Sequence, residues 1–267
     1  MSHKLRSALM WVFSVIFTLA FVYYQRQTGP TYPVTVKTEM DQQLIKNRLI
    51  RTWECGSDAG ISLRIPDTSV NGYLQYKRYN SYDAWFELRM ERVKDSLIAY
   101  LPDQPPAGKM EYRIFLERSG IRTPLTVEPV VLRYKGAVPD WILFIHILLI
   151  FSAMLLSTRT GLEALINGNR IVAYTRVTLI LLLVGGLIFG PVIQKYAFDA
   201  FWTGWPLGDD LTDNKTLVAF IFWLIAFIQQ QRNHKSKVWI IIAAVVLVII
   251  FLIPHSMWGS ELNYMEQ

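Results

Sequence analysis

The pattern of hydrophobic and polar positions divides the chain into apolar runs and one large polar block. Most of the charged residues lie in positions 26–140, and the apolar runs outside this block cover residues 9–24, 141–156, 173–193, 217–228 and 238–253. Spanning a bilayer takes roughly 20 mostly apolar residues, and neutral or aromatic neighbours extend the shorter runs. The pattern therefore predicts an α-helical membrane bundle of about five transmembrane helices, of which the fourth is the weakest.

Lysine and arginine in the short connections predict the orientation of these helices. The N-terminus and the segments 157–172 and 229–237 are basic, whereas the segment 194–216 and the C-terminus carry more acidic than basic residues. Short basic loops stay on the cytoplasmic side of a membrane. We therefore expect a cytoplasmic N-terminus and a polar block and C-terminus on the outer side. Residues 21–24 continue the first apolar run past a weak signal-cleavage pattern, which favours an uncleaved anchor.

The polar block alternates apolar and polar residues with period two, and turn residues interrupt it about every ten positions. This pattern predicts strands at 32–38, 43–53, 60–66, 72–79, 84–90, 96–102, 109–118 and 128–134. Seven or eight short strands without a helical stretch are typical of a β-sandwich. The expected domains are thus residues 1–25, an anchor; 26–138, an external all-β domain; and 139–267, a four-helix membrane domain.

The stretch YLPDQPPAGKMEYRIFL, residues 100–116, gives the external domain a further feature. It resembles the corner of immunoglobulin-like and fibronectin-type domains, where a tyrosine early in one strand bonds back to the backbone. Leu101 and Tyr112 would take the two parts of this corner. The polar block also contains no histidine. An immunoglobulin-like domain of this kind most often binds a partner, an expectation that rests on analogy of fold.

Composition and charge exclude several classes of protein. An apolar content of 52% is too high for an ordinary soluble domain, and the net charge of +6 is partly explained by the basic cytoplasmic loops. The external block has 17 Lys and Arg against 13 Asp and Glu over residues 25–138, with no basic stripe, so we expect no nucleic-acid partner. Cys55 is the only cysteine, which excludes an intrachain disulfide.

Two histidines are predicted near the outer side of the membrane. His146 lies in the second apolar run and His255 follows Pro254 after the fifth. Because imidazole is a common ligand of iron, copper and zinc, the pair could hold haem b or a metal ion. A proton path through His146 and nearby carboxylates is a second hypothesis. The third interpretation is structural: His146 hydrogen-bonds a neighbouring helix.

The connection WTGWPLGDDLTDNKT, residues 202–216, concentrates polar residues on the same side. Trp202 and Trp205 are typical of the membrane interface. Asp210 or Thr212 would cap the next helix, and Asp213 would lie in its first turn, at the positive end. A cap and a first-turn carboxylate account for two of the three aspartates in this connection and leave the third without an assigned role. We therefore regard the external cluster Trp202, Trp205, Asp209, Asp210, Asp213 and Glu261 as a candidate contact surface or site.

Three segments carry a resemblance: STRTGLEAL (157–165), residues 194–216, and IPHSMWGSELNY (253–264). Together they are similar to a family of multi-span bacterial inner-membrane proteins with WTGWP-x-G-x-DLTDNKT and PHS-x-x-GSEL motifs. The resemblance implies a periplasmic location for the external domain and a joint importance of the loop and the tail. It brings no activity with it.

These observations predict a non-catalytic subunit or scaffold of a larger inner-membrane complex. Its partners would be membrane lipids and other membrane or periplasmic subunits, contacted by the sandwich domain and the external loops. The alternative is a redox protein that binds haem or a metal through His146 and His255. An enzyme that uses the aspartates as acid and base is the weakest hypothesis, because no nucleophile–base spacing is visible.

Overall fold

The computed structural model describes residues 2–40, 43–233, 237–254, 262 and 264–265. The chain divides into two compact units. The helical unit comprises Met1–Pro30 and Val138–Ser260, and the sheet unit comprises Thr31–Ala137 and Glu261–Gln267. The described tail residues Leu262, Tyr264 and Met265 therefore group with the strands, although α6 precedes them in the chain.

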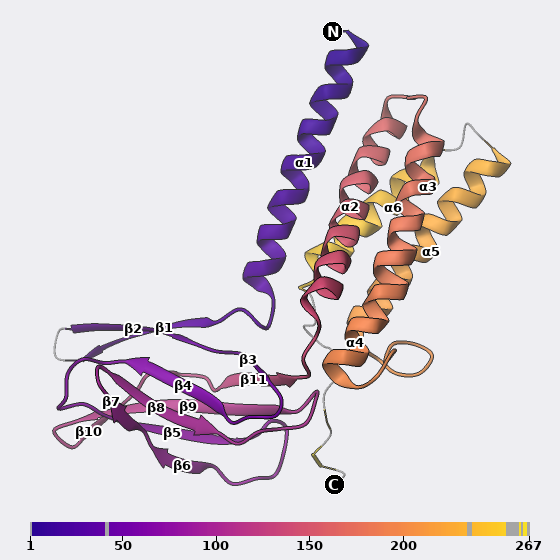
Figure 1. Cartoon of the computed structure of the whole chain (residues 1–267). Helices are drawn as coiled ribbons and strands as arrows, with labels where there is room; N and C mark the ends of the chain where they lie inside the picture. Colours follow the sequence, from indigo (N-terminus) through magenta and orange to yellow (C-terminus); the bar gives the residue numbers. More distant parts are fainter. Residues whose placement is uncertain (1, 41–42, 234–236, 255–261, 263, 266–267) are drawn as a thin grey trace. The chain divides into compact units, whose positions relative to one another are not determined.

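Five helices form the helical unit over the described residues (Figure 1): α1 (His3–Thr28), α2 (Asp140–Leu165), the continuous helix α3 (Ile171–Leu181), η1 (Leu182–Phe189) and α4 (Gly190–Phe198), then α5 (Leu211–Arg232) and α6 (Val238–Leu252). Four of them are long and apolar enough to cross a membrane. The prediction of about five spans is thus confirmed for four. The fourth apolar run, expected to be the weakest, forms a helix of 22 residues, whereas α6 is apolar but has only 15.

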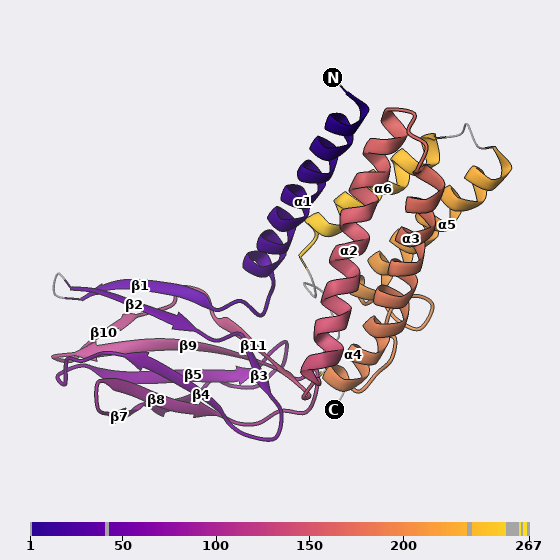
Figure 2. The same ribbon diagram turned by 45° about the horizontal axis from the view of Figure 1, so that its top comes forward.

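Contacts at both ends fix how α1 lies in the helical unit. Near its start, the rings of Trp11 and Tyr174 meet edge to face, with centroids 5.8 Å apart. Near its end, the Tyr24 hydroxyl donates to the carbonyl of Leu252 over 2.8 Å. The Gln25 amide also donates to the Ile253 carbonyl over 3.1 Å. The first half of α1, at Trp11, therefore lies beside the start of α3. The end of α1 lies beside the end of α6, as Figures 1 and 2 also show.

Close packing of α2 against η1 depends on glycine. A Cβ atom at Gly185 would lie 2.7 Å from the Cβ of Leu149, closer than side chains can approach. This segment of the third long helix is a π-helix, and Pro191 follows it at the second position of α4. Proline lacks the N–H group that would continue the α-helical ladder. Gly185 therefore permits the close contact between helices that small residues allow in membrane bundles.

The sheet unit is built from short strands: β1 (Val34–Met40), β2 (Gln43–Leu49), β3 (Thr52–Glu54), β4 (Ala59–Arg64), β5 (Asn71–Arg78), β6 (Phe86–Arg89), β7 (Glu91–Val93), β8 (Ser96–Leu101), β9 (Lys109–Arg118), β10 (Ile121–Pro124) and β11 (Val130–Lys135). They form three sheets: a β1–β2 hairpin; a six-stranded sheet of order β3-β11-β9-β5-β6, with β10 paired to β9; and a three-stranded sheet of order β4-β8-β7. Adjacent strands are antiparallel except β3 and β11, which are parallel.

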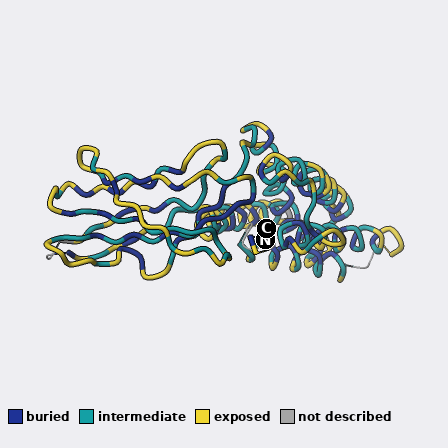
Figure 3. Tube along the Cα trace, turned by 90° about the horizontal axis from the view of Figure 1, so that it is seen from below, coloured by how far each residue is buried: buried dark blue, intermediate teal, exposed yellow. Residues whose placement is uncertain are grey.

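One hydrophobic core joins these sheets. Alternate residues of β4 and β8 and of β5 and β9 are buried, with Leu63, Leu74, Leu101 and Ile114 at 0% exposure. Successive side chains of a strand point to opposite faces, so the buried set faces the core and the other set faces outward. In Figure 3 the buried stretches run along the strands, and exposed residues concentrate in the connecting turns.

Two strand predictions were wrong in detail. Residues 43–53 form two strands, β2 and β3, which belong to different sheets. The chain leaves the hairpin at Ile50 and Arg51, so alternation of residue types continues across a change of sheet. The three- and four-residue strands β7 and β10 were not predicted, because a period of two cannot be recognised in so few residues.

The predicted corner tyrosine, Tyr112, bonds to the backbone as expected, but to a segment distant in the sequence. The Tyr112 hydroxyl donates to the carbonyl of Ile50 over 2.8 Å, 62 residues away, rather than to the preceding turn. It is Tyr134, on β11, whose hydroxyl donates to the carbonyl of Pro102 over 2.8 Å. Both rings are fully buried, and burial raises the pKa of each hydroxyl. Each tyrosine thus satisfies a backbone carbonyl where the chain changes sheets.

Removing the Tyr112 hydroxyl tests this role. In Tyr112→Phe the Ile50 carbonyl loses its donor, which we expect to lower the free energy of unfolding by about 1–3 kcal/mol. The thermal unfolding midpoint of the full chain in mild detergent would report the loss. Tyr82→Phe is the control, since Tyr82 is 90% exposed. Equal midpoints for both variants would contradict the assignment.

Candidate functional site

The connection between α4 and α5 contains most of the predicted external cluster. The helix α4 ends at Asp199, which has a left-handed backbone and whose carboxylate pairs with Lys195 over 2.6 Å. The helix α5 begins after Asp210, whose carboxylate accepts a hydrogen bond from the N–H of Thr212 over 2.7 Å. Asp210 is therefore the N-cap, as predicted, because such a cap satisfies a free N–H group of the first turn.

Asp213 holds the connection against the first turn of α5. Its Oδ2 accepts hydrogen bonds from the N–H groups of Thr203, over 2.8 Å, and Gly204, over 3.1 Å. A Cβ atom at Gly204 would lie 2.6 Å from the Cβ of Asp213, so only glycine allows this approach. The next residue, Asn214, accepts from the N–H of Trp205 over 2.6 Å. The loop is thus folded back on two successive side chains of α5.

Thr203 is the centre of this loop. Its carbonyl accepts from the N–H of Asp210 over 2.9 Å, and its hydroxyl lies 3.3 Å from a carboxylate oxygen of Asp210. The Gln194 amide, from α4, donates to the same hydroxyl. Polar groups of α4, the loop and α5 therefore form one network.

Lys215 links the start of α5 to the end of α6. Its ammonium donates to the carbonyls of Ile253, over 3.2 Å, and Pro254, over 3.3 Å. The last carbonyls of a helix have no partner within it and carry partial negative charge. Lys215, which is buried at 9% exposure, therefore has a structural role: its ammonium satisfies carbonyls at the end of α6.

Of the other cluster members that the structure describes, Trp202, Trp205 and Asp209, none contributes a side chain to this network. The Trp202 indole donates to the carbonyl of Trp205 over 3.1 Å, and Trp205 is 69% exposed. Asp209 is exposed. Glu261 lies outside the described residues. The structure therefore brings Asp210 and Asp213 together around Thr203 and leaves Asp209 on the surface.

His146 contacts the neighbouring helix. Its Nδ1 lies 2.8 Å from the carbonyl oxygen of Gly185, in η1, and must carry the proton because a carbonyl only accepts. The hydrogen bond to a neighbouring helix that the structural interpretation predicts is thus present. His255 lies outside the described residues, so its meeting with His146 stays a prediction. Among the described residues, no three His, Cys, Asp or Glu side chains are grouped so that they could hold a metal ion.

A buried ion pair at the other end of the helical unit was not predicted. Arg159 and Glu163, one turn apart on α2, pair over 2.5 Å at 1% and 4% side-chain exposure. The guanidinium of Arg159 lies 5.4 Å from the ring centre of Trp11 and 5.3 Å from that of Tyr174, which places it between α1 and α3. The spacing of four residues within STRTGLEAL was the available signal. This spacing alone does not indicate that the ion pair of Arg159 and Glu163 is buried.

The outward face of the six-stranded sheet carries a second unpredicted feature, which we call the arginine–aromatic face: Tyr73, Trp85, Arg113, Phe115 and Arg122. The guanidinium of Arg113 lies 4.3 Å from the ring centre of Trp85 and 5.6 Å from that of Phe115. The guanidinium of Arg122 lies 3.9 Å from the ring centre of Tyr73. Cations at these distances are attracted to aromatic rings.

Hydrogen bonds join the two arginines of this face. Arg113 donates to the Gln75 amide oxygen over 2.8 Å, and the Gln75 nitrogen donates to Glu87 over 2.7 Å. Arg122 donates through both terminal nitrogens to Glu87, each over 3.1 Å. Tyr73 and Gln75 alternate with the buried Gly72 and Leu74 along β5. Period-two alternation therefore placed these residues outward, but the sequence did not show which strands are neighbours.

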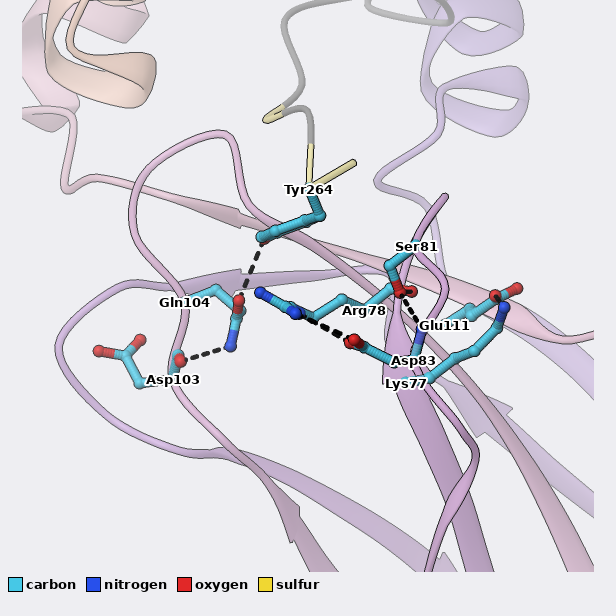
Figure 4. A network of polar contacts seen from close by, with 8 residues as sticks. All are labelled: Lys77, Arg78, Ser81, Asp83, Asp103, Gln104, Glu111 and Tyr264. Carbon is cyan, nitrogen blue, oxygen red and sulfur yellow. Dashed lines mark hydrogen bonds and ion pairs between the residues drawn. The ribbon is translucent and has the colours of Figure 1, made fainter. Parts of the chain in front are cut away.

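The C-terminal tail forms the third feature, shown in Figure 4. The Tyr264 hydroxyl donates to the Gln104 side chain over 3.0 Å, and its ring lies 5.0 Å from the guanidinium of Arg78. Arg78 in turn donates to both carboxylate oxygens of Asp83, over 2.7 and 2.9 Å. The hydrogen bonds from Arg78 hold the pKa of the Asp83 carboxyl at about 2. Tyr264, at 8% exposure, thus packs onto the sheet unit.

Comparisons of the chain with protein-family models, with curated proteins and with solved structures find no match.

Replacing Asp213 and Asp209 separately tests the roles assigned to them. Asp213→Ala leaves the N–H groups of Thr203 and Gly204 without their acceptor, and we expect a loss of about 2–3 kcal/mol in unfolding free energy. Asp209→Ala, the matched control, should leave the thermal midpoint unchanged. If Asp213→Ala were as stable as the control, the loop would not depend on this carboxylate.

Acidification tests the pair of Arg78 and Asp83. Because the folded pKa of Asp83 is about 2, against an ordinary value of 3.8, the stabilisation is complete above the ordinary value and is lost as the pH falls through about 2. We expect the thermal midpoint of Asp83→Asn to be below that of the unmodified chain at neutral pH, and the difference to disappear near pH 2. Glu128→Gln, an exposed carboxyl, is the control. A difference independent of pH would contradict this account.

Proposed function

We propose that this chain is a non-catalytic subunit of a bacterial inner-membrane complex, and that its sheet unit contacts another polypeptide of that complex. One observation carries the proposal: the arginine–aromatic face lies on the outward side of the six-stranded sheet, with Arg122 exposed and the other four side chains half-buried, and it is ordered by its own contacts. Tryptophan, tyrosine and arginine are the residues that contribute most to binding at protein interfaces. A ready-ordered set of such side chains loses little entropy when a partner binds.

We further propose that the sheet unit is an immunoglobulin-like sandwich. The order β4-β8-β7 corresponds to strands B, E and D of that fold, and β5-β9-β11 corresponds to strands C, F and G. The edge strand β6 would then be C′, and β3, parallel to β11, would be an added first strand. The β1–β2 hairpin and β10 are additions to this arrangement. Domains of this architecture serve many functions, so the binding role rests on the face and not on the fold.

The orientation that we propose places the sheet unit in the periplasm. The α2–α3 connection, with Arg170, and the end of α5, with Arg232, lie at the end of the helical unit where α1 begins (Figure 1). The α4–α5 connection, with Asp199, Asp209 and Asp210, lies at the opposite end. Basic residues mark the cytoplasmic side. The connections on either side of the eleven strands are short, residues 29–33 and 136–139, which favours a partner that is itself in or on the membrane.

Exposed aromatic side chains also lie at the edge strand β6, where Phe86 stacks on Tyr76 on the opposite face of the same sheet. Phe86 is 63% exposed and Tyr82, in the preceding turn, is 90% exposed. Large aromatic side chains in contact with water are a marker of interaction surfaces when they adjoin other such residues. The partner that fits is a polypeptide whose surface offers apolar side chains and carboxylates to the rings and guanidinium groups.

Co-purification from the native membrane in mild detergent tests this function. We expect a partner subunit to remain bound to the unmodified chain and to be lost in Trp85→Ala and Arg113→Ala, by at least about tenfold in recovered partner for a central interface residue. Tyr100→Ala, on the opposite sheet at 57% exposure, should retain it. Photo-cross-linking from position 85 would identify the contact. Partner recovery that is equal in all variants would contradict the role of this face.

A redox protein with haem b or a metal ion at His146 and His255 is the alternative. One observation favours it: the bond from Nδ1 of His146 to a backbone carbonyl fixes the imidazole and leaves Nε2 for a ligand, as in many metal sites. The visible absorption spectrum of the same purified sample distinguishes the two functions. A haem band that disappears in His146→Ala would support the alternative and contradict a purely non-catalytic subunit.

A further inference from the structure

A groove of about 330 Å³ lies in the sheet unit beside the β1–β2 hairpin. Its apolar lining comes from the hairpin and from the segment that follows β4: Met40, Leu44, Ile45, Ile65, Pro66 and Val70. Its polar lining is Lys46, Arg64, Asp67 and Arg118. This volume is at the lower end of the range of small-molecule sites.

The wall formed by residues 65–70 is held in place by buried and paired groups. The guanidinium of Arg92 donates to the carbonyls of Ile65, over 2.7 Å, Asp67, over 3.0 Å, and Val70, over 2.5 Å. The Asp67 carboxylate accepts from the N–H of Ser69 over 2.9 Å. Three carbonyls bound to one guanidinium fix the curve of this segment, so the groove exists before any ligand binds.

Asn47 holds the hairpin against the edge of β4. Its side-chain oxygen accepts from the N–H of Arg64 over 2.8 Å, and its nitrogen lies 3.5 Å from the Arg64 carbonyl. Both backbone groups of Arg64 are therefore used by one side chain, which is itself buried at 8% exposure. An extended peptide could not pair with the edge strand at this position, although exposed strand edges are common peptide sites.

The charges of the rim favour an anion. Lys46 and Arg64 are exposed cations, and Asp67 is paired with Arg118 over 3.4 Å. A ligand that matches this lining has an apolar chain for the floor and a negative group for the rim. A sugar or a nucleotide would leave its hydroxyl groups unpaired against Ile65 and Val70, which is unfavourable.

We propose that the groove binds one acyl chain and the head group of an anionic membrane lipid. The chain of the lipid would lie along the hairpin, and its phosphate would contact Lys46 and Arg64. The membrane in which the helices lie is the source. The hairpin lies outside the strands that match an immunoglobulin-like sandwich and supplies four of the ten lining residues. The proposal is independent of the arginine–aromatic face, which is formed by other residues.

Photo-cross-linking in vesicles tests the site in the full chain. The probe is phosphatidylglycerol with a diazirine in one acyl chain, and the matched arm is phosphatidylcholine with the same label. We expect cross-links on residues 44–46 and 64–70 with phosphatidylglycerol and few with phosphatidylcholine. Loss of one cation near an anionic lipid corresponds to about a fivefold weaker association, so Lys46→Gln and Arg64→Gln should each lower the yield by about that factor.

The controls separate this site from general attraction to the membrane. Arg48→Gln removes an equal charge from the same strand, outside the groove lining, and should leave the yield unchanged. Ile45→Trp, which fills the apolar floor, should abolish cross-linking, provided that its thermal midpoint matches that of the unmodified chain. The proposal is overturned if cross-links do not map to these segments, if both lipids label them equally, or if Arg48→Gln has the same effect as Lys46→Gln. A polypeptide found in the groove instead of lipid would also overturn it.

Discussion

Backbone N–H and carbonyl groups that become free at helix ends need partners among apolar helices, and this constraint organises the helical unit. Helix ends leave free N–H and carbonyl groups that water cannot reach inside a bundle. Asp210 accepts from the N–H of Thr212 at the start of α5, and Asp213 accepts from N–H groups of the preceding loop. Lys215 and Gln25 donate to carbonyls at the end of α6. The same requirement explains why His146 faces the π-helix: it donates to the Gly185 carbonyl. Residues that looked chemically active in the sequence are therefore mostly occupied by backbone groups.

The sheet unit solves a related problem at its edges and corners. A strand that ends or changes sheet leaves a backbone group without a ladder partner. Tyr112 and Tyr134 donate to such carbonyls from inside the core, and Arg92 donates to three of them beside the groove. These contacts are long-range in sequence, so they depend on the complete fold. They also keep the outer surfaces rigid, because the segments that carry exposed side chains are fixed from within.

Much of the architecture could be predicted from the sequence, because it follows from local periodicity. The apolar runs place all five helices, and alternation places most strands within a few residues. The cap at Asp210 follows from a single local rule. In contrast, the arginine–aromatic face requires knowing that β5, β9 and β6 are neighbours. The burial of Arg159 and Glu163 requires knowing how α1 and α3 pack on α2, and the contact of Tyr264 requires knowing where the tail returns. Non-local contacts of this kind leave no pattern in one sequence, and so the candidate site was predicted less well than the fold.

The side chains that neither satisfy backbone groups nor fill a core lie mainly in the sheet unit, which supports a functional role for that unit. Asp213, Lys215 and His146 are committed to backbone groups, and replacing them would first disturb packing. The arginine–aromatic face is different, since Arg113 and Arg122 contribute little to the core and remain on the surface at some entropic expense. The β1–β2 hairpin is also not required to close the sandwich core between β4, β8, β5 and β9. Residues that the fold does not need for its own stability can serve binding without a loss of stability. In this chain both features belong to the sheet unit.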